Sequence, residues 1–315
     1  MTTSTRRFTL RALAAAALAA GLPFAHAADA PPRVALVMKS LANEFFQTMQ
    51  DGAKANQKEH AADYTLITNG IKDETDTAAQ IKIVQQMLVE KVNAIVIAPA
   101  DSKALVPVLK EAADKGVIVV NIDNKLDEAA LKEKNLVVPF VGPDNRKGAK
   151  LVGDYLGTQL KAGEKVAILE GVSTTFNAQQ RTAGFQDAMK AVNASVVGVQ
   201  SGQWELDKAN TVASAMLREH PDLRAILAGN DNMALGAVAA IKTAGKTGKV
   251  LVVGYDNISA IKPMLADGRV LATADQFGAK QAVFGIETAL KALKAKQTQK
   301  DLSPVVETQV VLVKK

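Results

Sequence analysis

Residues 224–236, RAILAGNDNMALG, open the stretch that decides the fold of this chain, which runs through alanine-rich sequence to KVLVVGYD at residues 249–256. A short apolar run that ends in polar residues comes first. Apolar residues of helical period follow at Leu235, Val238 and Ile241, and a β-branched run closes the stretch. The pattern predicts a strand, a helix and a second strand.

Residues 93–123 repeat this organisation. NAIVIAPADSKAL precedes a predicted helix that ends near Gly116, and VIVVNID follows, so that Asp123 ends this copy as Asp256 ends the other. The spacing is too wide for a solenoid repeat and fits two similar α/β domains, each with an acid at the carboxyl end of a strand. A ligand is expected between the two domains.

The same alternation of strand and helix extends from Arg33 to Val313, with an interruption at residues 126–138. Continuous β-branched runs separated by single helices are typical of parallel sheets covered on both faces, which predicts an α/β protein with two doubly wound sheets. The chain is expected to cross between them near residues 141–144 and again after Gln276. The predicted lobes are residues 28–141 with 277–303, and residues 142–276 with 304–315.

The first 27 residues have the organisation of an export signal. Three arginines precede an apolar run at residues 12–20, and AHA at residues 25–27 places small residues at the two positions that a signal peptidase reads. Cleavage is therefore expected near Ala27. Arg6 and Arg7 also resemble a twin-arginine signal, which leaves the export route open between that pathway and the general one.

The charge of the mature chain is small. Removing the three signal arginines from 38 basic residues leaves 35 against 32 acidic ones, so the net charge falls from +6 to +3. The remaining lysines are scattered along predicted helices, which argues against a nucleic-acid partner. The chain has no cysteine, which excludes disulfides and thiolate metal sites. We expect neither a metal nor a cofactor.

Enzyme motifs fail when they are tested against the sequence. The segment at Gly245 lacks the glycine that a phosphate loop needs five positions earlier, where Ala240 stands. The segment at Gly171 lacks the second glycine of a nucleophile elbow. His60 and His220 are expected at the surface, near the carboxyl ends of helices.

Polar and aromatic residues instead gather at the predicted carboxyl ends of strands, where open parallel sheets bind ligands. Carboxylates accept hydrogen bonds from pairs of hydroxyls, amides both donate and accept, and aromatic rings pack on the C–H faces of sugars. The candidate ligand-binding residues are Asn43, Phe45, Phe46, Asp123, Asn124, Asn177, Arg181, Trp204, Asn230, Asp256 and Gln276.

Less specific roles compete with binding at several of these positions. Phe45 could belong to the core. Of the neighbours Asn230 and Asp231, we expect Asp231 to cap the following helix while Asn230 faces the cleft. Arg181 could instead pair with an acid at the surface, and Trp204 could be a hydrophobic staple.

Several short motifs are distributed along the chain, at residues 40–46, 101–102, 141–145, 181–185, 229–236, 253–256 and 272–276. In these motifs the chain resembles the periplasmic monosaccharide-binding proteins, most closely the ribose-binding type. The resemblance covers essentially the whole mature sequence.

The resemblance implies a role for most of the candidates. It implies that Phe46 and Trp204, with Phe45 beside them, sandwich a sugar ring. Asn124 departs from the arginine of ribose binders, and Asn177 stands where hexose binders carry an acid, so pentoses, hexoses and sugar alcohols all remain open. It implies hydrogen bonds to sugar hydroxyls from Asn43, Asp123, Arg181, Asn230, Asp256 and Gln276.

The resemblance also implies a function without catalysis. The protein would be the periplasmic binding subunit of an ABC importer, a monomer that closes about a hinge on its sugar and delivers it to a membrane permease or a chemoreceptor. An exported α/β enzyme acting on a small polyol and a sugar-sensing domain related to transcription regulators are the alternatives.

Overall fold

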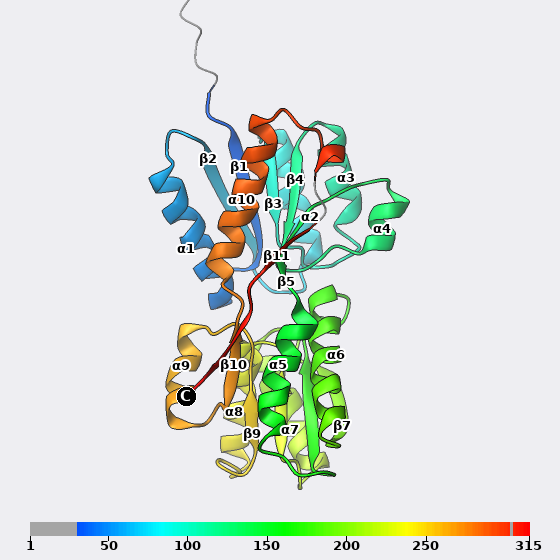
Figure 1. The fold of residues 1–315 in the computed structure, drawn as a ribbon, viewed down its shortest axis with the longest axis vertical. Helices are drawn as coiled ribbons and strands as arrows, with labels where there is room; N and C mark the ends of the chain where they lie inside the picture. Colours follow the sequence, from blue (N-terminus) through cyan, green and yellow to red (C-terminus); the bar gives the residue numbers. More distant parts are fainter. Residues whose placement is uncertain (1–29, 303–304) are drawn as a thin grey trace, which may run out of the picture. The chain divides into compact units, whose positions relative to one another are not determined.

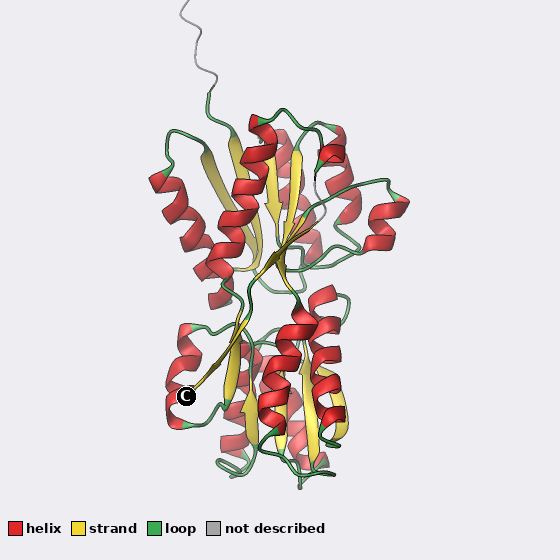
Figure 2. Ribbon diagram, viewed as in Figure 1, coloured by secondary structure: helices red, strands yellow, loops and turns green. Residues whose placement is uncertain are grey.

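Two six-stranded sheets, each covered by helices on both faces, make up the part of the protein that the computed structural model describes, residues 30–302 and 305–315 (Figures 1 and 2). The predicted α/β class with two doubly wound sheets is confirmed. The expected export signal lies outside the described residues.

The first sheet has the strand order β11-β5-β4-β3-β1-β2, and all its pairings are parallel. Apart from β2 and β11, its strands are almost entirely buried, as expected for runs covered on both faces. The strands are β1 (Arg33–Ser40), β2 (Thr65–Ile71), β3 (Ala94–Ile97), β4 (Ile118–Ile122), β5 (Phe140–Pro143) and β11 (Val305–Thr308).

Helices cover both faces of this sheet, and the alternation of side chains along β1 shows the two cores. Leu36 and Met38 join the core beneath α1 and α10, whereas Ala35 and Val37 join the core beneath α2 and α3. We call this sheet with its helices the first lobe. Its helices are α1 (Glu44–Glu59), α2 (Thr77–Val89), α3 (Val106–Asp114), α4 (Glu128–Glu133), α10 (Gly278–Lys294) and the 3₁₀ turn η2 (Gln299–Asp301).

The second sheet has the order β12-β10-β9-β8-β6-β7, in which only β12 among the described strands is antiparallel to its neighbour. The strands are β6 (Lys165–Glu170), β7 (Ser195–Ser201), β8 (Ala225–Ala228), β9 (Leu251–Val253), β10 (Ala272–Asp275) and β12 (Val311–Lys314).

Helices α5 and α6 pack on one face of the second sheet, and α7 and α8 pack on the other. We call this sheet with its helices the second lobe. Its helices are α5 (Asn145–Gly157), α6 (Phe176–Ala191), α7 (Leu206–Glu219), α8 (Asp231–Thr243), the 3₁₀ turn η1 (Ser259–Ile261) and α9 (Lys262–Asp267).

The chain passes between the lobes at three places, which Figure 1 shows as the segments after β5, β10 and β11. The first two agree with the crossings expected near residues 141–144 and after Gln276. The boundary at residue 304 is corrected, because β11 pairs with β5 in the first sheet, and the third crossing follows Thr308. No pattern in the sequence indicates β11 separately, because it is a short strand that is largely exposed.

The repeated unit is present in both lobes. It forms β3, α3 and β4 in the first lobe and β8, α8 and β9 in the second. The two histidines cap the carboxyl ends of helices as expected, His60 after α1 and His220 after α7. None of the helices in residues 30–302 and 305–315 combines the length and the apolar character that a membrane span requires.

Candidate functional site

A polar cavity lies where the carboxyl ends of the strands of both sheets meet, with about 210 Å³ free of protein atoms when the open solvent at its mouth is included. Its walls contain every candidate residue predicted from the sequence except Asn124, together with Lys39 and Glu74, which the prediction missed. The lining residues are Lys39, Asn43, Phe45, Phe46, Glu74, Asp123, Asn177, Arg181, Trp204, Asn230, Asp256 and Gln276.

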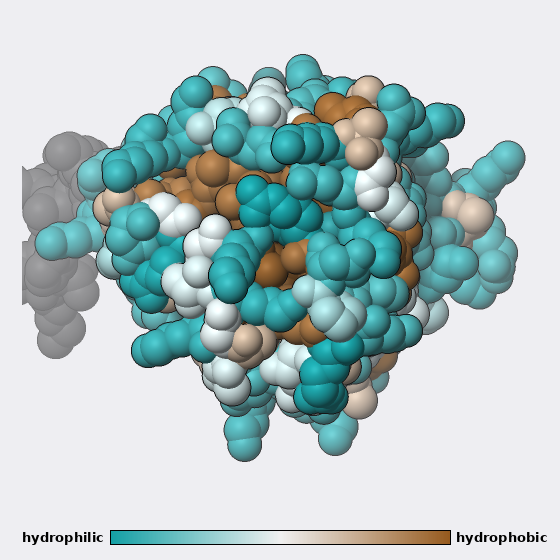
Figure 3. Space-filling view, turned by 90° about the horizontal axis from the view of Figure 1, so that it is seen from below, coloured by the Kyte–Doolittle hydropathy of each residue, from teal (hydrophilic) through white to brown (hydrophobic). Residues whose placement is uncertain are grey.

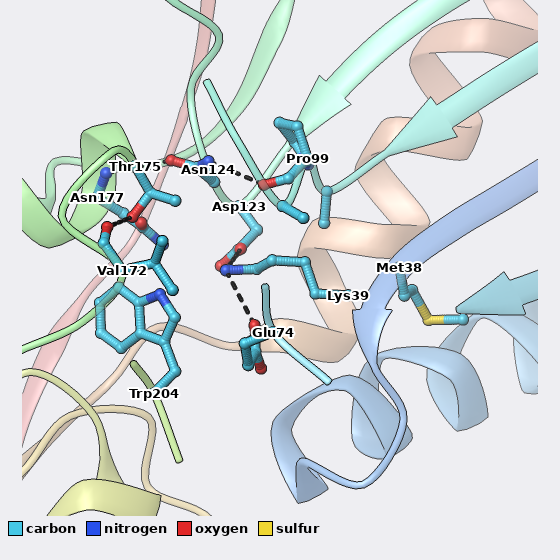
Figure 4. Close-up of polar contacts among 12 residues, drawn as sticks. Met38, Lys39, Glu74, Pro99, Asp123, Asn124, Val172, Thr175, Asn177 and Trp204 are labelled. Atoms are coloured by element: carbon cyan, nitrogen blue, oxygen red, sulfur yellow. Dashed lines mark hydrogen bonds and ion pairs between the residues drawn. The ribbon is translucent and has the colours of Figure 1, made fainter. Parts of the chain in front are cut away.

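Lys39 is a buried cation between two buried carboxylates of the first lobe (Figure 4). Its Nζ lies 3.6 Å from Glu74 Oε2 and 3.6 Å from Asp123 Oδ2. Lys39 is the penultimate residue of β1, Asp123 directly follows β4, and Glu74 lies between β2 and α2. Removing one member of such a group leaves a buried charge without its partner. The three side chains therefore form one electrostatic unit.

Arg181 is the corresponding cation of the second lobe, where it is 2% exposed on α6. Its Nε donates to Asn145 Oδ1 at 2.7 Å, and its Nη1 donates to the Gly229 carbonyl at 2.9 Å. The guanidinium lies 3.7 Å from the ring centroid of Tyr255 and 5.4 Å from that of Trp204. These contacts fix the guanidinium in the cavity wall and exclude the surface pairing that the sequence left open.

Asp256 is held against Arg181 by the end of β10. Gln276 Nε2 donates to Asp256 Oδ1 at 2.6 Å, and Arg181 Nη1 lies 3.5 Å from the same oxygen. Gln281 in turn donates to both oxygens of Gln276, which fixes the amide. The carboxylate therefore keeps its second oxygen available to the cavity.

Aromatic rings form two walls of the cavity. Phe45 and Phe46 pack edge to face, with centroids 5.2 Å apart, at the start of α1. Trp204 packs in the second lobe against Gly171 and Gly229, and a Cβ added at Gly171 would lie only 2.0 Å from the indole. The glycine thus lets the indole reach its place in the wall.

Two candidate amides also begin helices. Asn43 caps α1 by accepting from Phe45 N at 3.0 Å, and its Nδ2 donates to Glu74 Oε1 at 3.1 Å. Asn230 caps α8, accepting from Met233 N at 2.9 Å. The expectation that Asp231 is the cap is wrong.

The Asp231 carboxylate is instead buried inside the second lobe. It accepts from Thr273 Oγ1 at 2.7 Å and from Ile258 N at 3.1 Å, bonds that a side chain pointing back to its own helix could not make. Burial, together with the neighbouring Asp256, raises the pKa of this carboxyl.

Asn124 lies outside the cavity wall, and its side chain bonds to both lobes (Figure 4). Its Nδ2 donates to the Pro99 carbonyl at 2.9 Å, and its Oδ1 accepts from Asn177 N at 3.2 Å. Asn177, by contrast, lines the cavity from the first turn of α6.

Two carboxyls of the cavity have strongly shifted pKa values. Burial raises the pKa of Glu74 to about 7, against the opposing effects of Lys39 and of the hydrogen bond from Asn43. Burial also raises the pKa of Asp256 to about 7, where Arg181 opposes the shift and Asp123 adds to it. Closing the cavity around these acids therefore has a cost that hydroxyl donors could offset.

Several buried polar atoms of the lining residues have no hydrogen-bond partner within the described part of the chain. They are Asn177 Oδ1, Arg181 Nη2 and Trp204 Nε1, together with Glu74 Oε2 and Asp123 Oδ2, which accept no hydrogen bond but form ion pairs with Lys39 Nζ at 3.6 Å. Such atoms are rare in proteins unless a ligand or water satisfies them. Buried acceptors and donors beside aromatic rings suit a small neutral molecule with several hydroxyls.

A larger cavity, of about 930 Å³ by the same measure, lies at the opposite end of the second lobe, at the start of β9. It is bordered mainly by apolar side chains of α8, β9 and α9, such as Val238, Leu251 and Met264. Figure 3 shows this end of the protein, with hydrophobic residues in hollows among hydrophilic ones. This larger cavity lies away from the carboxyl ends of the strands and lacks the convergent polar groups of a specific site.

The chain belongs to the periplasmic binding protein family, because the model of the periplasmic binding protein domain matches residues 34–297. It is 68% identical to the D-ribose/D-allose-binding protein of Pseudomonas aeruginosa over 282 residues, which cover 90% of this chain and 88% of that protein. The resemblance inferred from the sequence is confirmed.

Solved structures agree with this assignment. An ABC transporter solute-binding protein of Burkholderia multivorans is 71% identical, with a TM-score of 0.88 over 90% of this chain and 99% of that one. Another from Actinobacillus succinogenes, with bound D-allose, is 36% identical, with a TM-score of 0.83 over 90% and 98% of the two chains. The family members are thus sugar-binding proteins of ABC importers.

The two missed lining residues differ in how readily sequence could have found them. Lys39 directly continues an apolar strand, so the rule that selected the other candidates applies to it equally. Glu74 lies in a loop rich in charged residues, KDETD at 72–76, and nothing in the sequence distinguishes it from Asp73.

Proposed function

We propose that this protein is the solute-binding subunit of an ABC importer and that it binds one monosaccharide in the cavity between its lobes. The observation that carries the proposal is the set of buried polar atoms in the cavity wall that have no hydrogen-bond partner in the described part of the chain, in a wall that also contains Phe46 and Trp204. A sugar supplies hydroxyls to those atoms and C–H faces to the rings.

D-Allose and D-ribose are the proposed ligands. In their pyranose forms these sugars share the configuration at C2, C3 and C4, and allose adds a hydroxymethyl group at C5. One set of donors and acceptors can therefore read both. The relative that is 68% identical is named for both sugars, and a solved relative holds D-allose, so we expect D-allose and D-ribose to bind.

Binding is proposed to act through closure of the two lobes. Asp123 and Lys39 belong to the first lobe, and Arg181 and Asp256 to the second, so a ligand reaches all of them only when the lobes meet. Its extra contacts in this form shift the population toward closure. The closed monomer would then present the sugar to a permease, after export to the periplasm and cleavage near Ala27.

We propose no catalytic step. The carboxylates of the cavity are held by Lys39, Arg181 and Gln276, and none of the described residues that line the cavity is a histidine or a cysteine. An enzyme acting on a small polyol would need a positioned nucleophile or base next to the scissile bond.

The test is calorimetric titration of the mature chain, freed of bound sugar by unfolding and refolding. D-Allose and D-ribose are compared with their C3 epimers, D-glucose and D-xylose. Binding of the first pair without their epimers supports the proposal. Absence of binding to all four, together with binding to another solute class, overturns it.

A further inference from the structure

Five hydrogen bonds connect the two lobes in the same manner: a side-chain oxygen of one lobe accepts from a backbone N–H of the other. The acceptors are Ser102, Asn124 and Glu44 in the first lobe and Glu205 in the second. Backbone donors at helix starts lack partners within their own helix, so they are available to such acceptors.

Helix α6 shows the arrangement most clearly. Its cap residue Thr175 makes no side-chain bond to the helix, because its hydroxyl donates to the Val172 carbonyl at 2.6 Å. Phe176 N instead donates to Ser102 Oγ at 2.9 Å, and Asn177 N donates to Asn124 Oδ1 at 3.2 Å. The helix of the second lobe is therefore capped by the first lobe.

The capping side chains are fixed by their own lobe before they meet α6. Asn124 is 0% exposed and its amide donates to the Pro99 carbonyl, while Ser102 Oγ donates to the Lys125 carbonyl at 2.8 Å. Ser102 Oγ and Asn124 Oδ1 are also 3.4 Å apart. Little reorganisation is needed when α6 arrives.

A second trans-lobe cap lies on the other side of the cleft. Glu44, in the first turn of α1, accepts from Ser259 N at 2.6 Å and from Ala260 N at 3.2 Å. These amides begin η1, whose own cap residue Ile258 offers no side-chain acceptor. Capping of α6 and of η1 therefore both depend on contact between the lobes.

We propose that Ser102, Asn124 and Glu44 are positioning residues, which cap helices of the second lobe only in the closed form and so set its population without touching the sugar. Through α6 they also place Asn177 and Arg181 at the cavity. The predicted change in sugar affinity rests on the proposed function, whereas the population of the closed form can be measured without any sugar.

The test uses fluorescence energy transfer between dyes on the two lobes. Because the chain has no cysteine, Lys82→Cys on α2 and Lys208→Cys on α7, both exposed, give a specific pair of labels. Single-molecule distributions yield the closed fraction with no sugar present, and titration with D-allose yields Kd and the dissociation rate.

We expect Asn124→Ala, Ser102→Ala and Glu44→Ala each to lower the ratio of closed to open molecules roughly 3- to 30-fold, the range for loss of a helix cap. Kd for D-allose should rise by the same factor, mainly through faster dissociation. The ratio of the Kd values for D-allose and D-ribose should stay unchanged. Glu44 is only half-buried, so its variant tests the proposal even if Asn124→Ala fails to fold.

Asp127→Ala is the matched control, since Asp127 caps α4 within the first lobe by accepting from Ala130 N at 2.8 Å. It should lower the unfolding midpoint and leave the closed fraction unchanged. An unchanged closed fraction in Glu44→Ala and Ser102→Ala would overturn the proposal. So would a changed allose-to-ribose ratio in Asn124→Ala, which would make Asn124 a ligand contact. Failure of wild type to bind any sugar would overturn only the proposed function.

Discussion

Asp123 and Asp256 follow β4 and β9, the last strands of the two repeated units, and both have a left-handed backbone, with φ of 60° and 118°. Such conformations are uncommon for residues other than glycine and persist only where the surroundings impose them. Both carboxylates line one cavity from opposite lobes. The repeat thus places two acids symmetrically about one candidate site.

Replacing Asp256 with Ala should remove sugar binding and leave a cooperative fold. The carboxylate lines the cavity, whereas Asp231 in the same unit is bonded inside the lobe to Thr273 and Ile258. Asp231→Ala should therefore lower the free energy of unfolding, by about 1–3 kcal/mol for the donors left without an acceptor. Denaturant unfolding and calorimetry of both variants check this. Loss of folding in Asp256→Ala would instead give this acid a structural role.

Replacing Gly171 with Ala should weaken binding by displacing the indole of Trp204, because the new Cβ would lie 2.0 Å from it. Trp204 is the only tryptophan of the chain, so its fluorescence reports the displacement directly. Gly198→Ala is the control, since the Cβ there would meet only Met216 at 3.8 Å. Wild-type emission and affinity in Gly171→Ala would show that the ring has room to move.

Replacing Lys39 with Met should disrupt the closed form, because Glu74 and Asp123 then lose the cation between them. Breaking a buried pair in this way costs about 3–5 kcal/mol, which predicts a loss of D-allose binding beyond 100-fold. Adding Glu74→Gln to Lys39→Met should recover part of the affinity. A double-mutant cycle measures this coupling, and simple additivity of the two changes would contradict it.

Acidification should favour closure of the ligand-free protein. Burial in the closed form raises the pKa values of Glu74 and Asp256 to about 7, whereas carboxyls in water titrate near about 4. Between about pH 4 and pH 7 the closed form therefore binds more protons than the open form. This stabilisation of the closed form is lost as the pH rises through 7.

The labelled protein described above gives the measurement at pH 5.5 and pH 8. We expect a larger closed fraction at pH 5.5, and a flatter dependence when Glu74→Gln and Asp256→Asn are combined. A closed fraction that rises with pH would mean instead that the ionised carboxylates stabilise the closed form.

The sequence by itself determined the α/β class, the doubled unit and most of the cavity wall. Strands covered on both faces must be continuously apolar, so their ends, where polar residues begin, are visible in a single sequence. The same rule selected Asp123 and Asp256, which the fold brings to one cavity, whereas Arg181 was chosen through the family resemblance.

Only the tertiary structure decided how the remaining polar groups are shared. Asn230 and Asp231 are both residue types that cap helices well. Asn230 is the cap, whereas Asp231 accepts a hydrogen bond from Thr273 of β10. The Glu74 side chain lines the cavity, whereas Asn124 lies outside it and caps α6. Both positions depend on partners that are distant in sequence. The lobe assignment of β11 likewise depended on pairing with β5, a contact between strands more than 160 residues apart. The local sequence pattern shows where polar residues follow an apolar strand. The partner of each polar side chain is decided by chain segments that meet only in the folded protein.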